Sequence, residues 1–504
     1  MGKLTNRVAK GVFWVLMEKF GLQAVHFVVT LVLARLLTPN DYGTVALLSI
    51  FIHISNVFVD CGFGKALVQK KTATQTDMNS VFFLSVAIAL VLYAVLFVAA
   101  PWVADFYRIP ELTVMMRVLA VSLIFHSVNG VQNVELNRKM LFKLSFRISW
   151  ARAVVSAVTG ISFAYAGYGP WALVWASLFG GVTGVIARQL VIRWRPTLMV
   201  SRQSIRELFG FGWKVTAIAV INQIYSNIQG LLIGRFYTRA DLAFVNKGRH
   251  MPNLLKNIVD GSLTRVSFSA LSKLQDDPDK LRNAMRRMIR TTTFCIYPMM
   301  VVLVILADPL ITVLYGAKWR PAVPFLQIIC FSAALTPFDT VNRQALLARG
   351  RSDIVLKLMA LRRICCLIVL AFTIRLGVLT FFACSTFTIV PLGVIINSLP
   401  NRKHLGYKIM MQLRDVSESF LLALATAALL YATTFLPLPK AWMLLPQIVL
   451  AFAFYVTCAV LFRNGGLVEI LKALLPTMSA KLGEKTWLIS RIRRFVEGKG
   501  NSHD

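Results

Sequence analysis

The sequence predicts an all-α, polytopic integral membrane protein. Of its 504 residues, 57% are hydrophobic and only 15% are charged, and the mean hydropathy is +0.66. These values exclude an ordinary soluble enzyme. Lys and Arg number 55 against 22 Asp and Glu, a net charge of +33. Because the basic residues lie between long apolar blocks, this charge indicates a membrane and no nucleic-acid partner.

Apolar blocks of about 20 residues, enough for a helix to cross about 30 Å of hydrocarbon, follow one another along almost the whole chain. The first follows Lys3, Arg7 and Lys10 and is too long for a signal-peptide core, so we expect it to stay as an anchor. The eighth is so polar that we expect it to face an aqueous cavity. The fourteen expected spans begin near Gly11, Tyr42, Ser80, Thr113, Ile148, Pro170, Leu208, Asp241, Thr291, Val323, Ile354, Gly377, Ser417 and Trp442.

The distribution of Lys and Arg predicts the orientation. With the N-terminus inside, most basic residues lie on segments that are then cytoplasmic, as the positive-inside rule requires. If the eighth span did not cross, many later basic residues would lie outside. We therefore expect fourteen transmembrane helices with both termini in the cytoplasm.

An internal repeat organises these spans. Leu31, Arg35, Thr38, Asp41, Val45, Val59 and Asp60 recur 200 positions later as Leu231, Arg235, Thr238, Asp241, Val245, Val259 and Asp260, and Ser122, Arg152 and Gly167 recur 210 positions later as Ser332, Arg362 and Gly377. Six spans per copy is an even number, which predicts two parallel six-helix repeats around a shared cavity. We expect an N-terminal lobe at 1–203, a C-terminal lobe at 204–403, two additional spans at 404–465 and a basic amphipathic cytoplasmic tail at 466–504. Chance similarity between apolar segments is the alternative.

The clearest motif of the first copy is LARLLTPNDYG at 33–43, followed by DCGFGKALVQ at 60–69. It resembles Wzx-type polysaccharide flippases of the multidrug/oligosaccharidyl-lipid/polysaccharide (MOP) exporter superfamily. The resemblance implies transfer of undecaprenyl-pyrophosphate-linked oligosaccharide from the cytoplasmic to the periplasmic leaflet of the bacterial inner membrane, for lipopolysaccharide or exopolysaccharide biosynthesis. The second copy has Arg239 where the first has Pro39, so the motif is clear in one lobe only. No substrate-site residue can be assigned to this chain from the resemblance.

Polar residues at spacings of four, three and four follow one face of several expected spans. They are Lys19, Gln23, His26 and Thr30; Ser49, His53, Asn56 and Asp60; Ser122, His126, Asn129 and Asn133; Ser332, Thr336, Asp339 and Arg343; and, in the eighth span, Asn246, His250, Asn253, Asn257, Asp260 and Thr264. We expect these faces to line the cavity.

Basic residues outnumber acidic ones at membrane depth, where a charge costs about 2.5–3.5 kcal/mol. A pyrophosphate head group would balance the excess. The expected cationic cavity consists of Lys19, Arg152, Lys214, Lys247, Arg249, Lys256 and Arg362. Snorkelling toward the membrane surface explains Arg117, Arg265 and Arg343 instead.

The titratable stripe residues are candidates for ion coupling: His26, His53, Asp60, His126, His250, Asp260 and Asp339. Coupling to H⁺ or Na⁺ stays open, and no other cofactor and no metal are expected. Helix-to-helix hydrogen bonding by the histidines is the alternative, as are ion pairs of Asp60 and Asp260 with Lys65 and Arg265. Kinks are expected at Pro252 and Pro337, and a close helix approach at Gly180 and Gly184.

Two amphipathic segments are expected to lie on the inner leaflet. The first runs from 271 to 290, with Asp277 and Pro278 as the cap of a helix that has apolar residues opposite arginines. The second is the tail, where Arg491, Arg493 and Arg494 accompany Trp487 and Phe495. Docking of other polysaccharide-assembly proteins on these segments is the alternative.

Together these features predict a transporter that works by alternating access and performs no covalent chemistry. A drug exporter of the same superfamily would be expected to have an acidic cavity, and a lipid II flippase is a second alternative. A membrane-embedded polysaccharide polymerase or ligase, from a different class, would need a substantial external loop, which the expected topology lacks.

Overall fold

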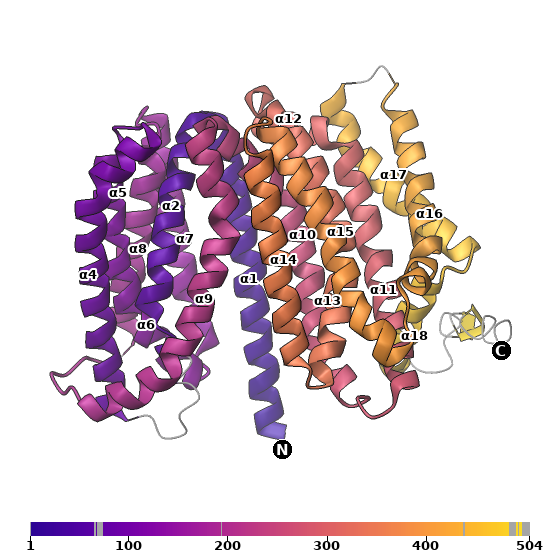
Figure 1. The fold of residues 1–504 in the computed structure, drawn as a ribbon, viewed down its shortest axis with the longest axis horizontal. Helices are drawn as coiled ribbons and strands as arrows, with labels where there is room; N and C mark the ends of the chain where they lie inside the picture. Colours follow the sequence, from indigo (N-terminus) through magenta and orange to yellow (C-terminus); the bar gives the residue numbers. More distant parts are fainter. Residues whose placement is uncertain are drawn as a thin grey trace. The chain divides into compact units, whose positions relative to one another are not determined.

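The computed structural model describes residues 2–64, 67, 74–192, 194–436, 439–482, 490–491 and 493–495, and every element within them is helical (Figure 1). Each of the fourteen expected spans coincides with a helix, and the fourth is divided into two helices at Val121. Nine helices in this part of the chain are long and apolar enough to cross a membrane. The chain is therefore a multi-pass membrane protein, as predicted. Its helices form two compact units, Met1–Ala243 and Phe244–Asp504.

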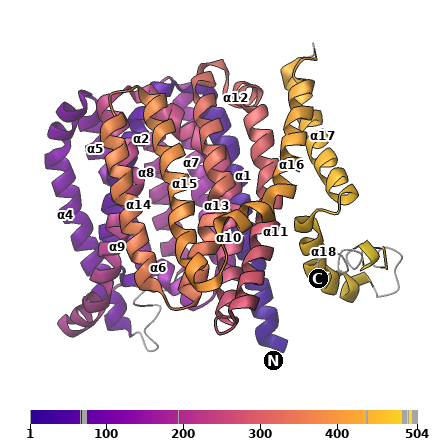
Figure 2. The ribbon, with the colours of Figure 1, turned by 45° about the vertical axis from the view of Figure 1, so that its right-hand side comes forward.

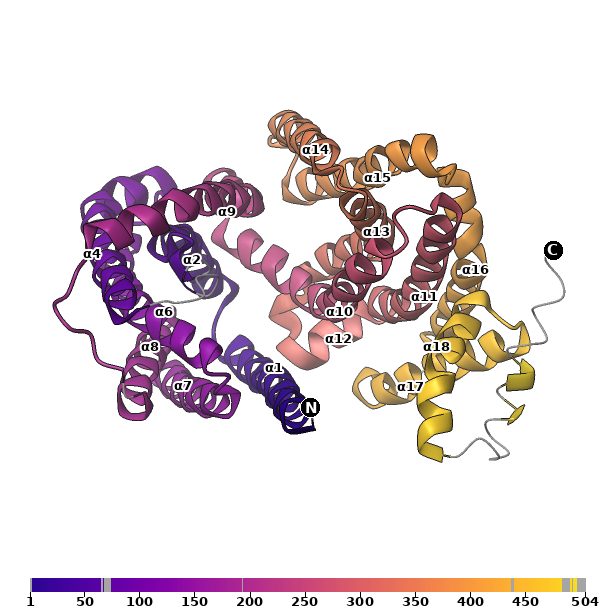
Figure 3. The same ribbon diagram turned by 90° about the horizontal axis from the view of Figure 1, so that it is seen from below.

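In the N-terminal unit (Met1–Ala243), α2 lies among α4, α6 and α9, as Figure 3 shows from one end. Helices α7 and α8 pack closely together, α1 packs on α7, and α2 packs on α6 and α9. The helices are α1 Gly2–Leu36, α2 Pro39–Asp60, α4 Gln75–Tyr107, α5 Leu112–Ala120, α6 Ser122–Arg138, α7 Phe142–Tyr165, α8 Trp171–Val191, α9 Arg202–Phe236 and the first residues of α10 Arg239–Ser272.

The repeated Thr and Asp residues are helix-start residues. Asp41 Oδ2 accepts hydrogen bonds from the backbone N and Oγ1 of Thr38 at 2.8 and 2.7 Å, and the Thr38 hydroxyl accepts from Asp41 N. Thr238 and Asp241 repeat these three bonds at the start of α10. A reciprocal pair of this kind satisfies backbone N–H groups that a helix start leaves without partners. The most recognisable residues of the repeat thus define where two helices begin.

The C-terminal unit (Phe244–Asp504) is built around α11 and α13, with α16, α17 and α18 at one side (Figure 2). Both α10 and α13 continue through their prolines, Pro252 and Pro337. The helices are the remainder of α10, α11 Pro278–Ile305, α12 Ala307–Tyr315, the 3₁₀ turn η1 Ala317–Ala322, α13 Val323–Ala348, α14 Ser352–Thr373, α15 Val378–Leu405, α16 Ile409–Thr433, α17 Lys440–Leu461 and α18 Gly465–Leu482.

Of the segment between 271 and 290 that was expected on the inner leaflet, residues 278–290 form the first half of α11. The predicted cap is correct, because the Asp277 side chain accepts from Lys280 N at 3.0 Å. Leu281, Met285 and Ile289 are fully buried within the protein. The prediction of a lipid contact was wrong because an apolar face at helical spacing does not specify whether lipid or another helix covers it. Much of the tail, including Trp487, lies outside the described residues.

Candidate functional site

A buried arginine in the last turn of α8 organises the polar centre of the N-terminal unit. Arg188 is only 8% exposed. Its Nε and Nη2 donate to Asn133 Oδ1 at 3.3 and 3.0 Å, and its Nη1 donates to Asn129 Oδ1 at 3.2 Å and to the Gly184 carbonyl at 3.0 Å. All these acceptors are neutral. The guanidinium is therefore held in place without being neutralised by them.

Close packing of α7 on α8 brings a second cation to this position. A Cβ at Gly180 would lie 3.0 Å from Ser156 Cβ, and one at Gly184 would lie 3.1 Å from Arg188 Nη1 and 3.6 Å from Arg152 Cδ. These glycines thus provide the close approach expected from their spacing. Arg152 is exposed and close enough to act electrostatically on Arg188. Arg152 and Arg188 therefore lie close together in the N-terminal unit.

The acidic group that acts on Arg188 is Glu18 of α1. Its Oε1 accepts hydrogen bonds from the hydroxyls of Ser145 and Ser149 at 3.2 and 2.7 Å. Both Glu18 and Arg152 act electrostatically on Arg188, and one carboxylate against two guanidinium groups leaves Arg152, Arg188 and Glu18 together with a net positive charge. We call these three residues, with Asn129 and Asn133, the arginine cluster.

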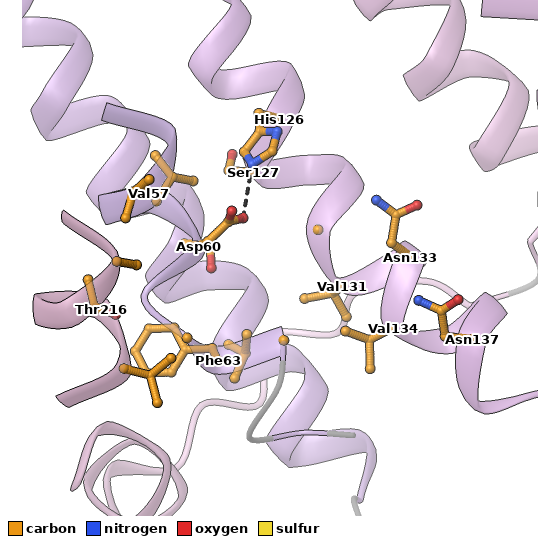
Figure 4. Close-up of a pocket in the computed structure, with 18 residues that line it drawn as sticks. Val57, Asp60, Phe63, His126, Ser127, Val131, Asn133, Val134, Asn137 and Thr216 are labelled. Atoms are coloured by element: carbon orange, nitrogen blue, oxygen red, sulfur yellow. Dashed lines mark hydrogen bonds and ion pairs between the residues drawn. The ribbon is translucent and has the colours of Figure 1, made fainter. Parts of the chain in front are cut away.

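A cavity of about 670 Å³ lies beside the arginine cluster, among α2, α4, α6 and α9 (Figure 4). Asn133 lines the cavity and also accepts from Arg188, so the two features share a side chain. Most of the wall is apolar, including Phe63 and Val134. Into it project Asp60 and His126, whose Oδ1 and Nε2 atoms are 2.9 Å apart.

This Asp60–His126 pair joins two stripe residues from different helices, α2 and α6. Their side chains keep 60% and 40% of their exposure, so the pair is open to the cavity. The alternative partner predicted for Asp60, Lys65, lies outside the described residues. In the C-terminal unit, Asp260 accepts from Thr340 Oγ1 at 3.0 Å, and Lys256 and Arg343 lie near it. The side chain of Arg265 is outside the described part.

The C-terminal unit neutralises its matching arginine. Arg362 Nη1 donates to Asp339 Oδ1 at 2.9 Å, and Asn397 Nδ2 donates to the same oxygen at 2.7 Å. A Cβ at Gly393 would overlap the guanidinium, at 2.6 Å from Cζ. Arg362 is therefore enclosed and paired, in contrast to Arg152.

Three of the expected ligand-binding or coupling residues of α10 contact aromatic side chains, two of them at the ring face and one at a hydroxyl. Lys247 is buried, with Nζ 5.1 Å from the ring centre of Tyr315 and 5.2 Å from that of Trp319. Arg249 lies over the Phe382 ring at 5.0 Å, and His250 Nδ1 is 3.4 Å from the Tyr315 hydroxyl. Cation–π contacts of this kind stabilise a positive charge within the protein.

The remaining predicted residues are less informative. His26 and His53 are exposed, and the side chains of Lys19 and Lys214 lie outside the described part of the chain. Arg152 and Arg362 belong to separate units. Among the described residues, no group of three His, Cys, Asp or Glu side chains is arranged to hold a metal.

Arg188 was not predicted, because it lies close to a helix end. The signal was nevertheless present: Gly180, Gly184 and Arg188 are four residues apart. This spacing continues the small-residue face of α8 to the arginine, toward the helix that the glycines contact.

Comparison with known proteins identifies similar chains. The family described as "Polysaccharide biosynthesis protein" matches residues 32–324, more than half of the chain. The teichuronic acid biosynthesis protein TuaB of Bacillus subtilis is 23% identical over 84% of this chain and 87% of its own. The succinoglycan biosynthesis transport protein ExoT of Rhizobium meliloti is 25% identical over 66% and 68%. The lipopolysaccharide biosynthesis protein WzxC of Escherichia coli is 21% identical over 70% and 72%.

Two solved transporter structures share the fold. A lipid II flippase, MurJ, in an inward closed conformation superposes with a TM-score of 0.72 at 14% identity, covering 90% of this chain and 99% of its own. An inward-facing MATE family multidrug transporter of the MOP superfamily superposes with a TM-score of 0.61 at 15% identity, covering 76% and 94%. The predicted all-α, MOP-like fold is thus confirmed. The relatives named for an activity are a transport protein and a flippase, in agreement with the prediction that the chain is not an enzyme.

Proposed function

The chain belongs to the family of polysaccharide biosynthesis proteins, and from this premise we propose that it flips undecaprenyl-pyrophosphate-linked oligosaccharide repeat units across the bacterial inner membrane. The units pass from the cytoplasmic to the periplasmic leaflet, for lipopolysaccharide or exopolysaccharide assembly, by alternating access of two six-helix lobes. Both termini lie in the cytoplasm in this proposal. The names of ExoT and WzxC, a transport protein and a lipopolysaccharide biosynthesis protein, support the class of substrate.

The observation that carries the proposal is the arginine cluster. Arg188 has its geometry fixed by Asn129 and Asn133, and Arg152 stands beside it. The single carboxylate of Glu18 does not neutralise both arginines, and a bound diphosphate would supply the remaining negative charge. Arginine binds phosphate oxygens through parallel N–H bonds, which the exposed Arg152 can offer. Arg188 has most of its N–H groups engaged with Asn129, Asn133 and the Gly184 carbonyl, so it contributes mainly its positive charge.

The position of the cluster suits the cytoplasmic leaflet. Arg188 lies in the last turn of α8, and Asn133 in the second half of α6. In the proposed topology both helices run inward, so these ends lie near the cytoplasmic surface, where the substrate is presented. Outward movement of the anion from a negative interior is then favoured by about 2.3 kcal/mol per charge per 100 mV.

Cation coupling is assigned to the Asp60–His126 pair. The pair faces the same cavity that Asn133 lines, so a change in its protonation acts within a few side chains of the arginine cluster. In this proposal a proton bound by the pair returns inward as the substrate leaves.

The test is transbilayer movement of a lipid-linked oligosaccharide in proteoliposomes at matched levels of inserted protein. We expect Arg152→Ala with Arg188→Ala to abolish movement. Arg147→Ala removes an exposed arginine of the same helix, α7, and serves as the matched control. Equal movement by the double variant and wild type would show that this cluster does not bind the diphosphate head group. If the wild-type protein moved lipid II but not the lipid-linked oligosaccharide, lipid II would be the substrate and the proposed one would be wrong.

A further inference from the structure

A second groove lies on α8, in the half opposite Arg188. It measures about 400 Å³ and is walled by aromatic side chains of α4 and α8. Tyr93 and Phe97 stand on one side, with ring centres 5.9 Å apart, and Trp175 and Phe179 on the other, also 5.9 Å apart. Phe97 and Phe179 are 40% and 44% exposed. The groove is thus open at the surface of the unit.

One charge stands in this apolar groove. Arg117 of α5 lies over the Phe97 ring at 4.3 Å, and its Nε donates to the Phe97 carbonyl at 3.2 Å. The other residues that line the groove are uncharged. Among the described residues the structure gives Arg117 no carboxylate partner, so most of its N–H donors are available to an anion.

The groove has a direction. Arg117 lies in the last turn of the short helix α5, within the first third of the candidate span Leu112–Arg138, whereas Phe125 of α6 lies further along that span. About 12 Å of helix separates Arg117 from Phe125 at 1.5 Å per residue. In the proposed topology Arg117 lies near the periplasmic surface, and the groove descends from it toward the middle of the bilayer.

We propose that this groove holds the lipid-linked oligosaccharide in the periplasmic leaflet after its transfer, with the diphosphate at Arg117 and the polyprenyl chain along the aromatic walls. The inference rests on the proposed function. Charge complementarity favours this occupant. A diphosphate carries more negative charge than the single phosphate of a phospholipid, so it is attracted more strongly to the Arg117 guanidinium. It also lacks the ammonium group of a phospholipid such as phosphatidylethanolamine, which Arg117 would repel. The apolar walls of the groove shield the polyprenyl chain from polar groups. The arginine cluster and the groove then form an entry site and an exit site on the two halves of α8.

Site-specific photo-crosslinking in proteoliposomes of phosphatidylethanolamine and phosphatidylglycerol tests the proposal. The probe is a radiolabelled undecaprenyl-diphosphate-linked oligosaccharide, and benzoylphenylalanine replaces Phe179, which keeps an aromatic wall. The control position is Val158 of α7, which is 60% exposed and about as far from its own helix end. We expect strong labelling from position 179 and little from position 158. Arg117→Gln should reduce labelling about tenfold, as expected for loss of a charge-assisted hydrogen bond, whereas Arg117→Lys should retain part of it.

Equal labelling from the two positions would overturn the proposal, as would labelling that is insensitive to Arg117→Gln. Labelling of phospholipid alone at position 179, with no competition by the diphosphate lipid, would assign the groove to membrane lipid and also overturn it. The flipping assay in the same vesicles separates the two proposals. Movement by wild type without labelling at 179 rejects only the exit site, whereas absence of movement rejects the proposed function.

Discussion

Arg362 and Asp339 form an ion pair at 2.9 Å in the C-terminal unit, and the N-terminal unit has no such pair at the matching positions. Arg152 matches Arg362 at an offset of 210, and at the same offset Asn129 stands where Asp339 does. Asn129 accepts from Arg188 and carries no charge. Two differences at this offset separate the copies: the second has a carboxylate in place of the Asn129 amide, and Ser398 in place of Arg188. Both differences lower the positive charge of the second copy at these positions.

This asymmetry predicts different consequences for the two arginines. Arg152→Ala should reduce transport of the diphosphate lipid at least tenfold at matched insertion, because a charge-assisted phosphate contact is lost. Arg362→Ala should leave transport close to wild type but lower stability by about 2 kcal/mol, because Asp339 loses its partner. Flipping rates and thermal unfolding in detergent measure the two effects.

Adding Asp339→Asn to Arg362→Ala is the control. The double variant should recover most of the lost stability, since it removes the unpaired carboxylate as well. If Arg362→Ala abolished transport while its unfolding temperature stayed unchanged, Arg362 would be a substrate ligand after all.

Gly184→Ala is expected to separate substrate binding from stability. The added Cβ would lie 3.1 Å from Arg188 Nη1, so the guanidinium must shift and its orientation toward the diphosphate changes. Alanine is favoured over glycine within a helix by about 1 kcal/mol, so stability should not fall. Competition binding with a diphosphate lipid should show weaker affinity. Gly210→Ala in α9, where a Cβ meets nothing within 4 Å, should leave the affinity unchanged and should likewise not lower stability. An unaltered affinity for Gly184→Ala would show that the position of Arg188 is unimportant for binding.

His126→Gln tests ion coupling. Glutamine keeps a hydrogen-bond donor for Asp60 but cannot take up a proton. Transport driven by the substrate gradient alone should persist, whereas its stimulation by an imposed pH gradient should disappear. His53→Gln removes an exposed histidine of α2 and should preserve the stimulation. Stimulation that survives in the His126 variant would assign coupling elsewhere.

The sequence predicted the helices well because each expected span is long, apolar and bounded by clear signals such as the Thr38–Asp41 and Asp277–Pro278 caps. It predicted site residues less well. Spacing placed His126 and Asp60 on inward faces, but it could not show that they pair across α2 and α6. Nor could it show that Lys247 contacts aromatic rings while Arg188 binds two amides, because the partners come from segments distant in the chain.

The segment from 271 to 290 illustrates the same limit. It was expected to lie on the inner leaflet, yet its Arg286 and Arg290 bind a protein carboxylate, and Arg287 approaches Glu469 of α18. Lipid phosphates and buried carboxylates select the same cationic side chains. Only the packing of α16 and α18 on α11 decides between them.

Asp415 is predicted to hold the two additional helices on the rest of the C-terminal unit. Its side chain is 1% exposed and accepts two hydrogen bonds from Arg286, at 2.9 and 2.8 Å, one from Arg290 at 2.5 Å and one from the Tyr407 hydroxyl at 2.8 Å. Asp415→Asn removes the charge that balances both arginines and replaces an acceptor by a donor. We expect a loss of about 2–4 kcal/mol, less than for a fully buried pair because the arginines keep 35% exposure.

Thermal unfolding in detergent measures this loss, and Asp279→Asn provides the matched control. Asp279 pairs with Arg282 on the same helix, but its side chain is 76% exposed, so its removal should cost no more than about 0.5 kcal/mol. If α16 is held by this contact, proteolysis between α15 and α16 should also become faster in Asp415→Asn and not in Asp279→Asn. Equal stability of the two variants would mean that apolar packing of α16 on α11, and not the carboxylate, fixes the helices.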